Sequence, residues 1–320
     1  MGRGRIVVDV DAGLDDYVAL LIFLHADKLG DIKVEGIICT NGNTTRENVV
    51  RNVIRLLELV GRTDIPVYKG AQEQFILHRK PFILHQPPLY QYHGQDGFGD
   101  MKHDTDPDVS LVKDTPASFA LSDLVLSAPH QISVICLGPL TTLALTLKLF
   151  PELAGKIKDV WIMGGNIRGV GNITSSAEFN FYMDPEAVHI VLECLKCEIY
   201  ILPWEPCSTV LISKVWLYNT FATDKLYLEL LARGEKSIEK HAESNGWMPC
   251  DAFLAFCFIN PRKAITKCSK HNATIELYSS HTRGQMVLDH LKKKEDNVTI
   301  IEDFDVELFM EHLLKIKTEL

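Results

Sequence analysis

Short apolar runs alternate with longer amphipathic runs along most of this chain. Six runs are rich in Val, Ile and Leu, as strands buried on both faces of a sheet are, and they cover residues 6–10, 34–40, 132–137, 160–163, 199–203 and 274–278. Apolar residues recur at helical spacing in residues 15–28, 45–60, 117–127, 140–149, 185–194, 229–244 and 306–316. Strands that alternate with helices predict an α/β fold: an open, mostly parallel, Rossmann-like sheet with helices on both faces.

No internal repeat or low-complexity linker divides the chain, so residues 1–320 are predicted to form a single domain. The 33 basic and 42 acidic residues give a net charge of -9, which disfavours a nucleic-acid or anionic-membrane surface and favours a small substrate. No apolar run is long enough to span a bilayer, and the first residues lack the apolar core of a signal peptide. We therefore expect a cytoplasmic protein.

Two irregular stretches are predicted to form a rim above the sheet. Residues 70–108 are rich in Pro, His and Gly, and a loop of this length in a compact domain is usually functional or disordered. It contains His78, His85, His93 and His103. The second stretch, residues 203–206, directly follows a predicted strand.

Four carboxylates follow the first predicted strand within eight positions: Asp9, Asp11, Asp15 and Asp16. In open α/β sheets, ligands bind outside the carboxyl ends of the strands. Asp15 and Asp16 open a predicted helix, and a negative charge that complements the helix dipole explains one of them. It does not explain Asp9 and Asp11, whose alternating positions place them on the same side of the strand. Like charges this close favour a cation among them, and carboxylate oxygens favour calcium or magnesium.

A second polar group lies further along the chain. If this segment is extended, Glu178 and Asn180 face the same way and could hold a polyhydroxylated ligand, whereas Phe179 and Phe181 point into the core. Asp184 precedes Pro185, as an N-cap residue precedes a proline at the first helical position.

Asp251 is the last acidic candidate. It opens an apolar helical run, so its simplest interpretation is also that of an N-cap.

These residues resemble, in order, the motifs of the inosine-uridine-preferring nucleoside hydrolases. The segment from Asp9 to Asp16 resembles the family's D-x-D-P-G-x-D-D signature, and Gly42-Asn43 resembles its G-N. The turn from Leu137 to Thr141 resembles its L-G-P-L-T-N. Further matches to its M-G-G, N, A-E-F-N and D-P-E-A series are Met163-Gly164-Gly165, Asn172, Ala177-Glu178-Phe179-Asn180 and Asp184-Pro185-Glu186-Ala187. The resemblance covers about residues 5–260.

The resemblance implies calcium-dependent hydrolysis of ribonucleosides to ribose and free base, by a homodimer or homotetramer. It implies that calcium is held by Asp11, Asp16, Asp251 and the backbone carbonyl of Leu137, and that Asp11 is the general base. Residues implied to bind the ribose are Asp15, Asn43, Met163, Asn172, Glu178, Asn180 and Asp251. Asn43 would thereby also be part of the catalytic group, and Asp9 would organise the loop from behind.

Three positions depart from the family pattern. Cys250 stands where many members have a His that protonates the leaving base, and a thiol is a poorer donor near neutral pH than an imidazolium. Trp247 or His93 could replace that His by stacking or by donating a proton. Ala12 replaces a Pro, and Thr142 replaces an Asn.

Two alternatives stay open at this point. A phosphatase of the haloacid-dehalogenase type also begins with D-x-D, with Asp9 as the nucleophile, Asp11 as the acid and magnesium as the metal, although this reading leaves Glu178 and Asn180 unexplained. A nucleoside- or ribose-binding protein without catalysis is the other alternative, and Cys250 is the feature in its favour.

Overall fold

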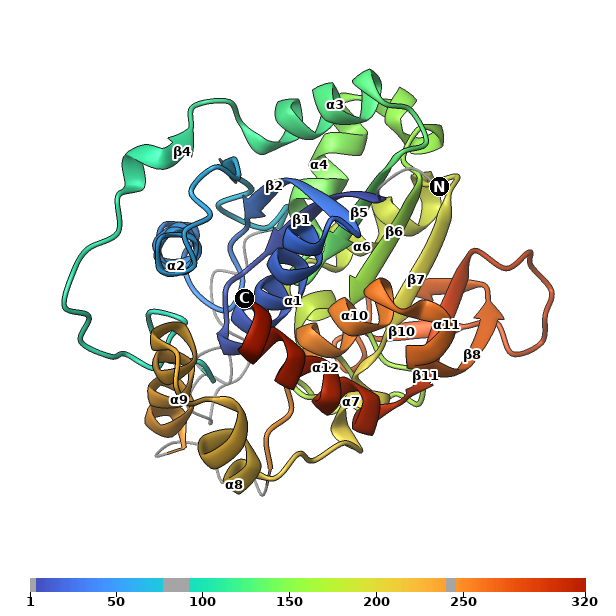
Figure 1. Ribbon diagram of the computed structural model, residues 1–320. Helices are drawn as coiled ribbons and strands as arrows, with labels where there is room; N and C mark the ends of the chain where they lie inside the picture. Colours follow the sequence, from blue (N-terminus) through green and yellow to red (C-terminus); the bar gives the residue numbers. More distant parts are fainter. Residues whose placement is uncertain (1–3, 77–91, 240–245) are drawn as a thin grey trace.

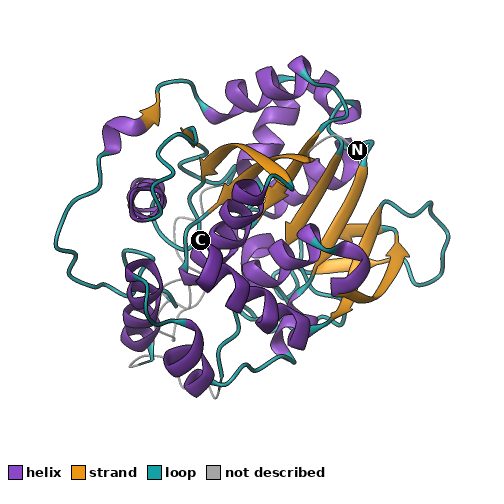
Figure 2. Cartoon of the chain, viewed as in Figure 1, coloured by secondary structure: helices purple, strands orange, loops and turns teal. Residues whose placement is uncertain are grey.

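The computed structural model describes residues 4–76, 92–239 and 246–320, and its centre is a nine-stranded sheet (Figures 1 and 2). The strand order is β4-β3-β2-β1-β5-β6-β7-β11-β8. The strands are β1 (Gly4–Val10), β2 (Ile32–Cys39), β3 (Val67–Lys69), β4 (Val112–Lys113), β5 (Ile132–Cys136), β6 (Asp159–Met163), β7 (Glu198–Leu202), β8 (Ile265–His271) and β11 (Val298–Phe304).

Neighbouring strands of this sheet are parallel except β11 and β8, which are antiparallel. The prediction of an open, mostly parallel α/β sheet is therefore confirmed. The chain builds outward from β1 in one direction through β2, β3 and β4, and in the other direction from β5 onward. This reversal between β1 and β5 creates a crevice at their carboxyl ends, where ligands bind in such folds.

Helices cover both faces of the sheet. One face is covered by α1 (Leu14–Leu29), α10 (Cys250–Ile259) and α12 (Val306–Glu319), with α2 (Arg46–Leu59) and α9 (Leu226–Ile238) further out; the other is covered by α3 (Ala117–Ser127), α4 (Thr141–Leu149) and α6 (Pro185–Cys194). None of the helices in the described ranges has the length and apolarity needed to cross a bilayer.

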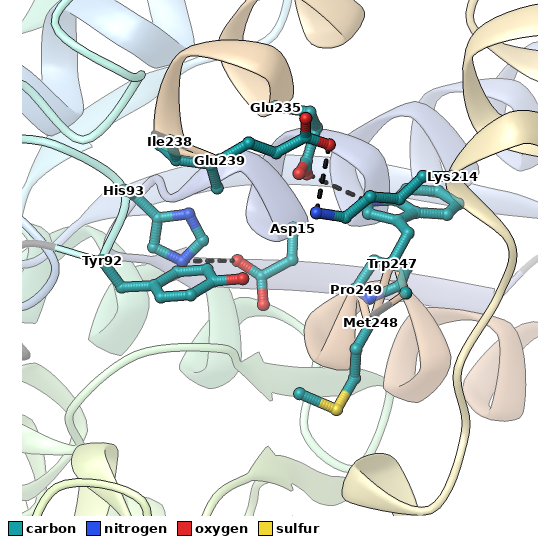
Figure 3. A pocket seen from close by; sticks show the side chains of 11 residues that line it. Asp15, Tyr92, His93, Lys214, Glu235, Ile238, Glu239, Trp247, Met248 and Pro249 are labelled. Carbon is teal, nitrogen blue, oxygen red and sulfur yellow. Dashed lines mark hydrogen bonds and ion pairs between the residues drawn. The ribbon is translucent and has the colours of Figure 1, made fainter. Parts of the chain in front are cut away.

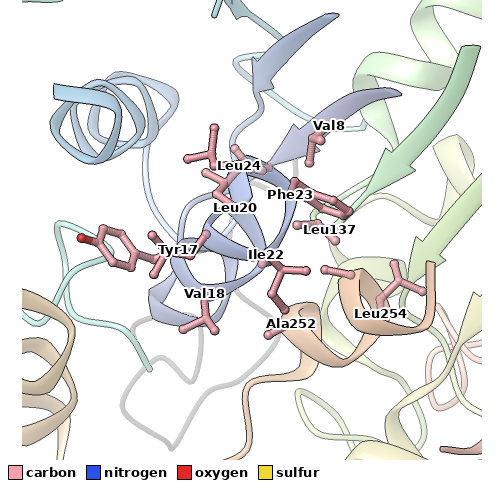
Figure 4. Packing of buried hydrophobic residues seen from close by; sticks show 14 of the residues in the cluster. Val8, Tyr17, Val18, Leu20, Ile22, Phe23, Leu24, Leu137, Ala252 and Leu254 are labelled. Carbon is pink, nitrogen blue, oxygen red and sulfur yellow. The ribbon is translucent and has the colours of Figure 1, made fainter. Parts of the chain in front are cut away.

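The packing of α1 against α10 decides where the acidic residues meet. Val18 and Ile22 of α1 lie beside Ala252 and Leu254 of α10 in the buried cluster (Figure 4). Burying each large apolar side chain contributes about 1.5–3 kcal/mol. This contact places the first turns of the two helices side by side, although they are more than 200 residues apart in the chain.

Several elements differ from the sequence prediction. The run at 274–278 does not join the main sheet, because β9 (Ala273–Ile275) pairs only with β10 (Met286–Leu288). Strands β3, β4, β8 and β11 were not predicted; β3 and β4 are very short, and β8 exposes many of its residues. The stretch predicted to be irregular at 203–206 lies in a short helix, α7 (Trp204–Ser208).

Two predicted features fall outside the described residues. His78 and His85 of the long loop are among residues 77–91, and the end of the helix predicted at 229–244 is among residues 240–245.

Candidate active site

Asp11 follows β1 directly, and its fully buried carboxylate is held by Asn43. The backbone N–H of Asn43 donates to Oδ2 at 2.8 Å and the side-chain amide donates to Oδ1 at 3.1 Å. Two glycines make room for this carboxylate: a Cβ at Gly42 would lie 2.0 Å from Asp11 Oδ2, and one at Gly138 would lie 2.8 Å from Asp11 Cβ. The glycines after β2 and β5 are therefore required by the close approach of Asp11.

The first turns of α1 and α10 bring three further carboxylates together. One oxygen each from Asp15, Asp16 and Asp251 lie within 4.8 Å of one another. The Asp16 carboxylate accepts the backbone N–H of Asp11 at 3.3 Å and that of Gly13 at 2.8 Å. The structure thus places Asp15, Asp16 and Asp251 in one cluster, with Asp11 beside Asp16.

Burial and mutual repulsion raise the pKa values of these acids. Burial, reinforced by neighbouring charges, raises the pKa of Asp11 and Asp251 well above the usual range, and burial beside Asp15 raises that of Asp16 to about 7. Asp251 is not an N-cap: Pro249 holds that position, and the Asp251 side chain turns into the cluster. Such a cluster favours either retained protons or a cation between the acids.

The oxygen atoms at this site fit calcium. Asp15 Oδ1 and Asn180 Oδ1 are buried without a hydrogen-bond partner among the described residues, and buried acceptors of this kind are rare unless a ligand or ion satisfies them. The Leu137 carbonyl at the end of β5 accepts from Asn180 Nδ2 at 2.7 Å and keeps a second lone pair. Carboxylate and carbonyl oxygens are hard ligands, which calcium prefers.

Glu178 and Asn180 are arranged by a short helix, α5 (Phe179–Met183), and not by an extended segment as predicted. Glu178 is the N-cap, and its carboxylate accepts the N–H groups of Asn180 at 2.9 Å, Gly165 at 2.8 Å and Phe181 at 3.1 Å. Burial raises the pKa of Glu178 to about 7, although these hydrogen bonds oppose the shift. Asp184 is the N-cap of α6 and accepts the N–H of Ala187 at 3.1 Å, which confirms that expectation.

A cavity of about 370 Å³ opens above these residues. This volume suits a small molecule of nucleoside size. Its lining contains every predicted site residue except Asp11, Asp16 and Trp247. The lining residues are Asp15, Asn43, Tyr92, His93, Leu137, Met163, Asn172, Ile173, Glu178, Phe179, Asn180, Trp204, Met248, Cys250 and Asp251. Acids and amides therefore form one part of the wall, and aromatic and aliphatic side chains form another.

His93 and Asp15 both line this cavity, and their side chains lie beside each other (Figure 3). Its Nδ1 accepts the backbone N–H of Leu14 at 3.2 Å, and its Nε2 lies 3.4 Å from Asp15 Oδ1. Because Nδ1 is an acceptor, the proton of the neutral ring is on Nε2. Burial lowers the pKa of His93, with Asp15 opposing, so the ring is neutral at pH 7.

Cys250 and Trp247 occupy different positions relative to the cavity. The Cys250 thiol lines it, and a hydrogen bond with Cys207, together with burial, raises its pKa well above the usual range, so it is a neutral group. Trp247 is 3% exposed and does not line the larger cavity; its indole N–H donates to Glu235 Oε1 at 2.9 Å instead. Trp204, the first residue of α7, lines the larger cavity instead.

Sequence analysis missed the aromatic part of the wall. Tyr92 and Trp204 carried no motif, and Phe179, predicted to point into the core, lines the cavity. Glu235 was also missed, although the sequence holds a signal for it. It occupies one position of the apolar stripe formed by Leu228, Leu231 and Ile238, where a carboxylate is unexpected.

Asp9 and Ala12 of the first motif do not line the cavity either. Asp9 accepts a hydrogen bond from Thr40, whose hydroxyl is 2.6 Å from that of Thr142, and burial raises the pKa of Asp9 to about 8. Asp9 therefore supports the loop from behind. Ala12 has φ 47°, a value that proline cannot adopt, so the turn in this chain differs in backbone conformation from one with Pro at that position.

Comparison with known proteins agrees with this geometry. A family model described as "Inosine-uridine preferring nucleoside hydrolase" matches residues 6–311, so the chain belongs to that family. It is 33% identical over 240 residues to a "Probable uridine nucleosidase 2" of Oryza sativa subsp. japonica, covering 75% of this chain and 64% of that protein. It is 36% identical over 189 residues to a "Pyrimidine-specific ribonucleoside hydrolase RihA" of Citrobacter koseri, covering 59% of this chain and 56% of that protein. The chain thus matches less than two thirds of the length of these relatives.

A longer match is an uncharacterised protein of Schizosaccharomyces pombe, 30% identical over 317 residues that cover 96% of this chain and 91% of that protein. Among solved structures, an "Inosine-Guanosine Nucleoside Hydrolase (IG-NH)" superposes with a TM-score of 0.88 at 24% identity over 99% of both chains. A "Plant nucleoside hydrolase - PpNRh1 enzyme" superposes with a TM-score of 0.82 at 23% identity, again over 99% of both chains. At these identities the likeness establishes the fold.

Proposed function

We propose that this protein hydrolyses the N-glycosidic bond of ribonucleosides and releases ribose and a free base. One observation carries the proposal: carboxylates from distant parts of the chain, Asp15, Asp16 and Asp251, converge at a cavity that is also lined by Glu178, Asn180 and aromatic side chains. A nucleoside has the matching chemistry, with a hydroxyl-rich sugar and a flat base. The names of the relatives, a probable uridine nucleosidase and a ribonucleoside hydrolase, support this substrate class.

The acidic and amide groups act on the sugar. Asp15, Asn43 and Asn172 would hold ribose hydroxyls, as would Glu178, Asn180 and Asp251, with Met163 beside the ring. The unpartnered Asp15 Oδ1 and Asn180 Oδ1 are acceptors for such hydroxyls. Bond cleavage builds positive charge on the sugar, and preorganised carboxylates stabilise that charge.

Asp11 is the general base in this proposal. Its carboxylate would take a proton from the attacking water as the bond to the base breaks. The two hydrogen bonds from Asn43 fix its orientation. Calcium would be held by Asp11, Asp16, Asp251 and the Leu137 carbonyl, and when bound it supplies the Lewis acidity that eases deprotonation of water.

The phosphatase alternative does not fit the site. Asp9 would be its nucleophile, but the Asp9 carboxylate accepts from Thr40 behind the loop, whereas Asp11 accepts from Asn43, which lines the cavity. The binding protein without catalysis is the alternative that the neutral Cys250 favours, because a neutral thiol is a weak acid for a leaving base.

A substrate panel tests the proposal. The protein is incubated with calcium and uridine, cytidine, inosine, adenosine or guanosine, and free base and reducing sugar are measured by chromatography and a colorimetric assay. We expect equimolar base and sugar from at least one nucleoside, loss of activity with a chelator, and recovery when calcium is returned. Calorimetric binding of nucleosides without release of base would support the binding-protein alternative and contradict hydrolysis.

A further inference from the structure

A second, much smaller cavity adjoins the larger one (Figure 3). Its volume is about 20 Å³, which is room for about one water molecule. Asp15, Tyr92, His93 and Met248 line both cavities, so the two meet at these side chains. On its far side the small cavity is lined by Glu235 and Trp247.

Glu235 is a carboxylic acid placed where an apolar side chain belongs. It lies on the buried face of α9 and is 7% exposed. Its Oε1 accepts the indole N–H of Trp247 at 2.9 Å, which fixes the orientation of the group. In the neutral acid, Oε1 is then the carbonyl oxygen, and the proton is carried on Oε2.

Charged and titratable groups from several elements face Glu235. Burial, together with the charges of Asp15 on α1 and Glu239 on α9, raises its pKa to about 8, although the hydrogen bond from Trp247 and the charge of Lys214 oppose the shift. Tyr92 and His93 complete the surroundings. Glu235 therefore keeps its proton at neutral pH, where His93 is neutral and the Cys250 thiol has a strongly raised pKa.

We propose that Glu235 is the source of the proton that the leaving base takes up, delivered through one water molecule in the small cavity. The inference rests on the proposed nucleoside hydrolysis. As the bond between C1′ and the base nitrogen breaks, its electron pair stays on the base. One proton passes from Glu235 Oε2 to the water, and one passes from the water to the base. Glu235 is left as a carboxylate and regains a proton from solvent after the products leave.

This role supplies the proton donor that Cys250 does not provide. The chain lacks a His at that position, and the Nδ1 of His93 is occupied by the Leu14 N–H. Glu235 is a neutral acid that lines the small cavity, and His93 lines both this cavity and the larger one. It acts through water and does not contact the substrate itself.

The test compares two leaving groups in Glu235→Gln. This variant keeps an oxygen that can accept from Trp247 but has no acidic proton. One substrate is the best nucleoside of the panel, whose base needs a proton to leave; the other is p-nitrophenyl riboside, whose p-nitrophenolate leaves without one. We expect kcat on the nucleoside to fall about 100-fold, which is in the range for loss of a general acid, and kcat on the nitrophenyl substrate to change less than about 3-fold.

Two matched variants separate this role from a structural one. Trp247→Phe removes the indole N–H but leaves the acid, and a purely structural Glu235–Trp247 contact would make it mimic Glu235→Gln. Glu229→Gln makes the same chemical change on the exposed side of α9 and is expected to leave both rates unchanged. Equal losses on both substrates in Glu235→Gln, or no loss on either, would overturn the inference. If wild-type protein turns over neither substrate, the proposed function fails instead.

Discussion

Two groups of residues at the larger cavity are built in different ways. The first, called the sugar end, contains the acids and amides proposed to act on the ribose, and the second, called the base end, contains the aromatic side chains and Met248. At the sugar end, oxygen atoms come from strand ends and helix first turns; Asn43 holds the carboxylate of Asp11, and backbone N–H groups hold that of Glu178. At the base end, Tyr92, Trp204 and Met248 come from connections and a short helix. Under the proposed function, this difference means that groups at the ends of strands and helices would act on the sugar, whereas the connecting segments would recognise the base.

The largest expected effect comes from Asp11→Asn at the sugar end. The amide cannot take a proton from water, so turnover should fall by about 10²–10⁴-fold for every nucleoside, whichever nucleobase it carries. Steady-state kinetics over the panel measures this. Asp123→Asn, the same change at an exposed position of α3, is the control and should retain the wild-type rate. Near wild-type turnover in Asp11→Asn would show that Asp11 is not the base.

Trp204→Ala should affect the base end alone. Stacking of a base on an aromatic ring contributes about 1–3 kcal/mol, so kcat/KM should fall about 10-fold or more. We expect the loss to appear mainly in KM and to be larger for purine than for pyrimidine nucleosides, because the larger ring system has more area to stack. Trp204→Phe keeps an aromatic face and should recover most of the loss. Equal losses for all bases would show that Trp204 does not contact the base.

The last prediction concerns stability. The free energy of unfolding should depend on pH because of the buried acids of the first motif. The pKa values of Asp9 and Asp16 are about 8 and about 7 in the folded protein, above the usual 3.8. Between about pH 5 and pH 8 the folded state therefore holds protons that the unfolded state has released, and the free energy of unfolding falls as pH rises. In the proposed site, calcium would bind the deprotonated acids, so it should stabilise the fold more at pH 8 than at pH 5.

Thermal unfolding with chelator or with calcium measures this linkage. We expect Tm with chelator to fall by at least several degrees over that pH interval and calcium to reduce the fall, since each kcal/mol of lost stability lowers Tm by roughly 2 °C in a chain of this size. Asp16→Asn should flatten the pH dependence. A Tm that rises with pH in the presence of chelator would contradict the assigned protonation.

Much of the fold was predictable because its signals are local. The apolar runs that became β1, β2, β5, β6 and β7 are buried on both faces, so their composition alone marks them. The helices at 117–127 and 185–194 were predicted with their observed limits. Edge strands such as β8 were missed, because an exposed strand need not be apolar.

The sequence by itself determined the acidic motif after β1, the glycines and amides at the neighbouring strand ends, and the alternation that makes the sheet. These depend on residues close together in the chain, where spacing sets geometry. Only the tertiary structure decided that Asp251 faces Asp16 and is not a helix cap, that Trp204 and not Trp247 lines the larger cavity, and that Glu235 lies beside Asp15. Those relations depend on how α1, α9 and α10 pack on the sheet. Packing is set by the sum of many apolar contacts between distant segments, which no short motif records.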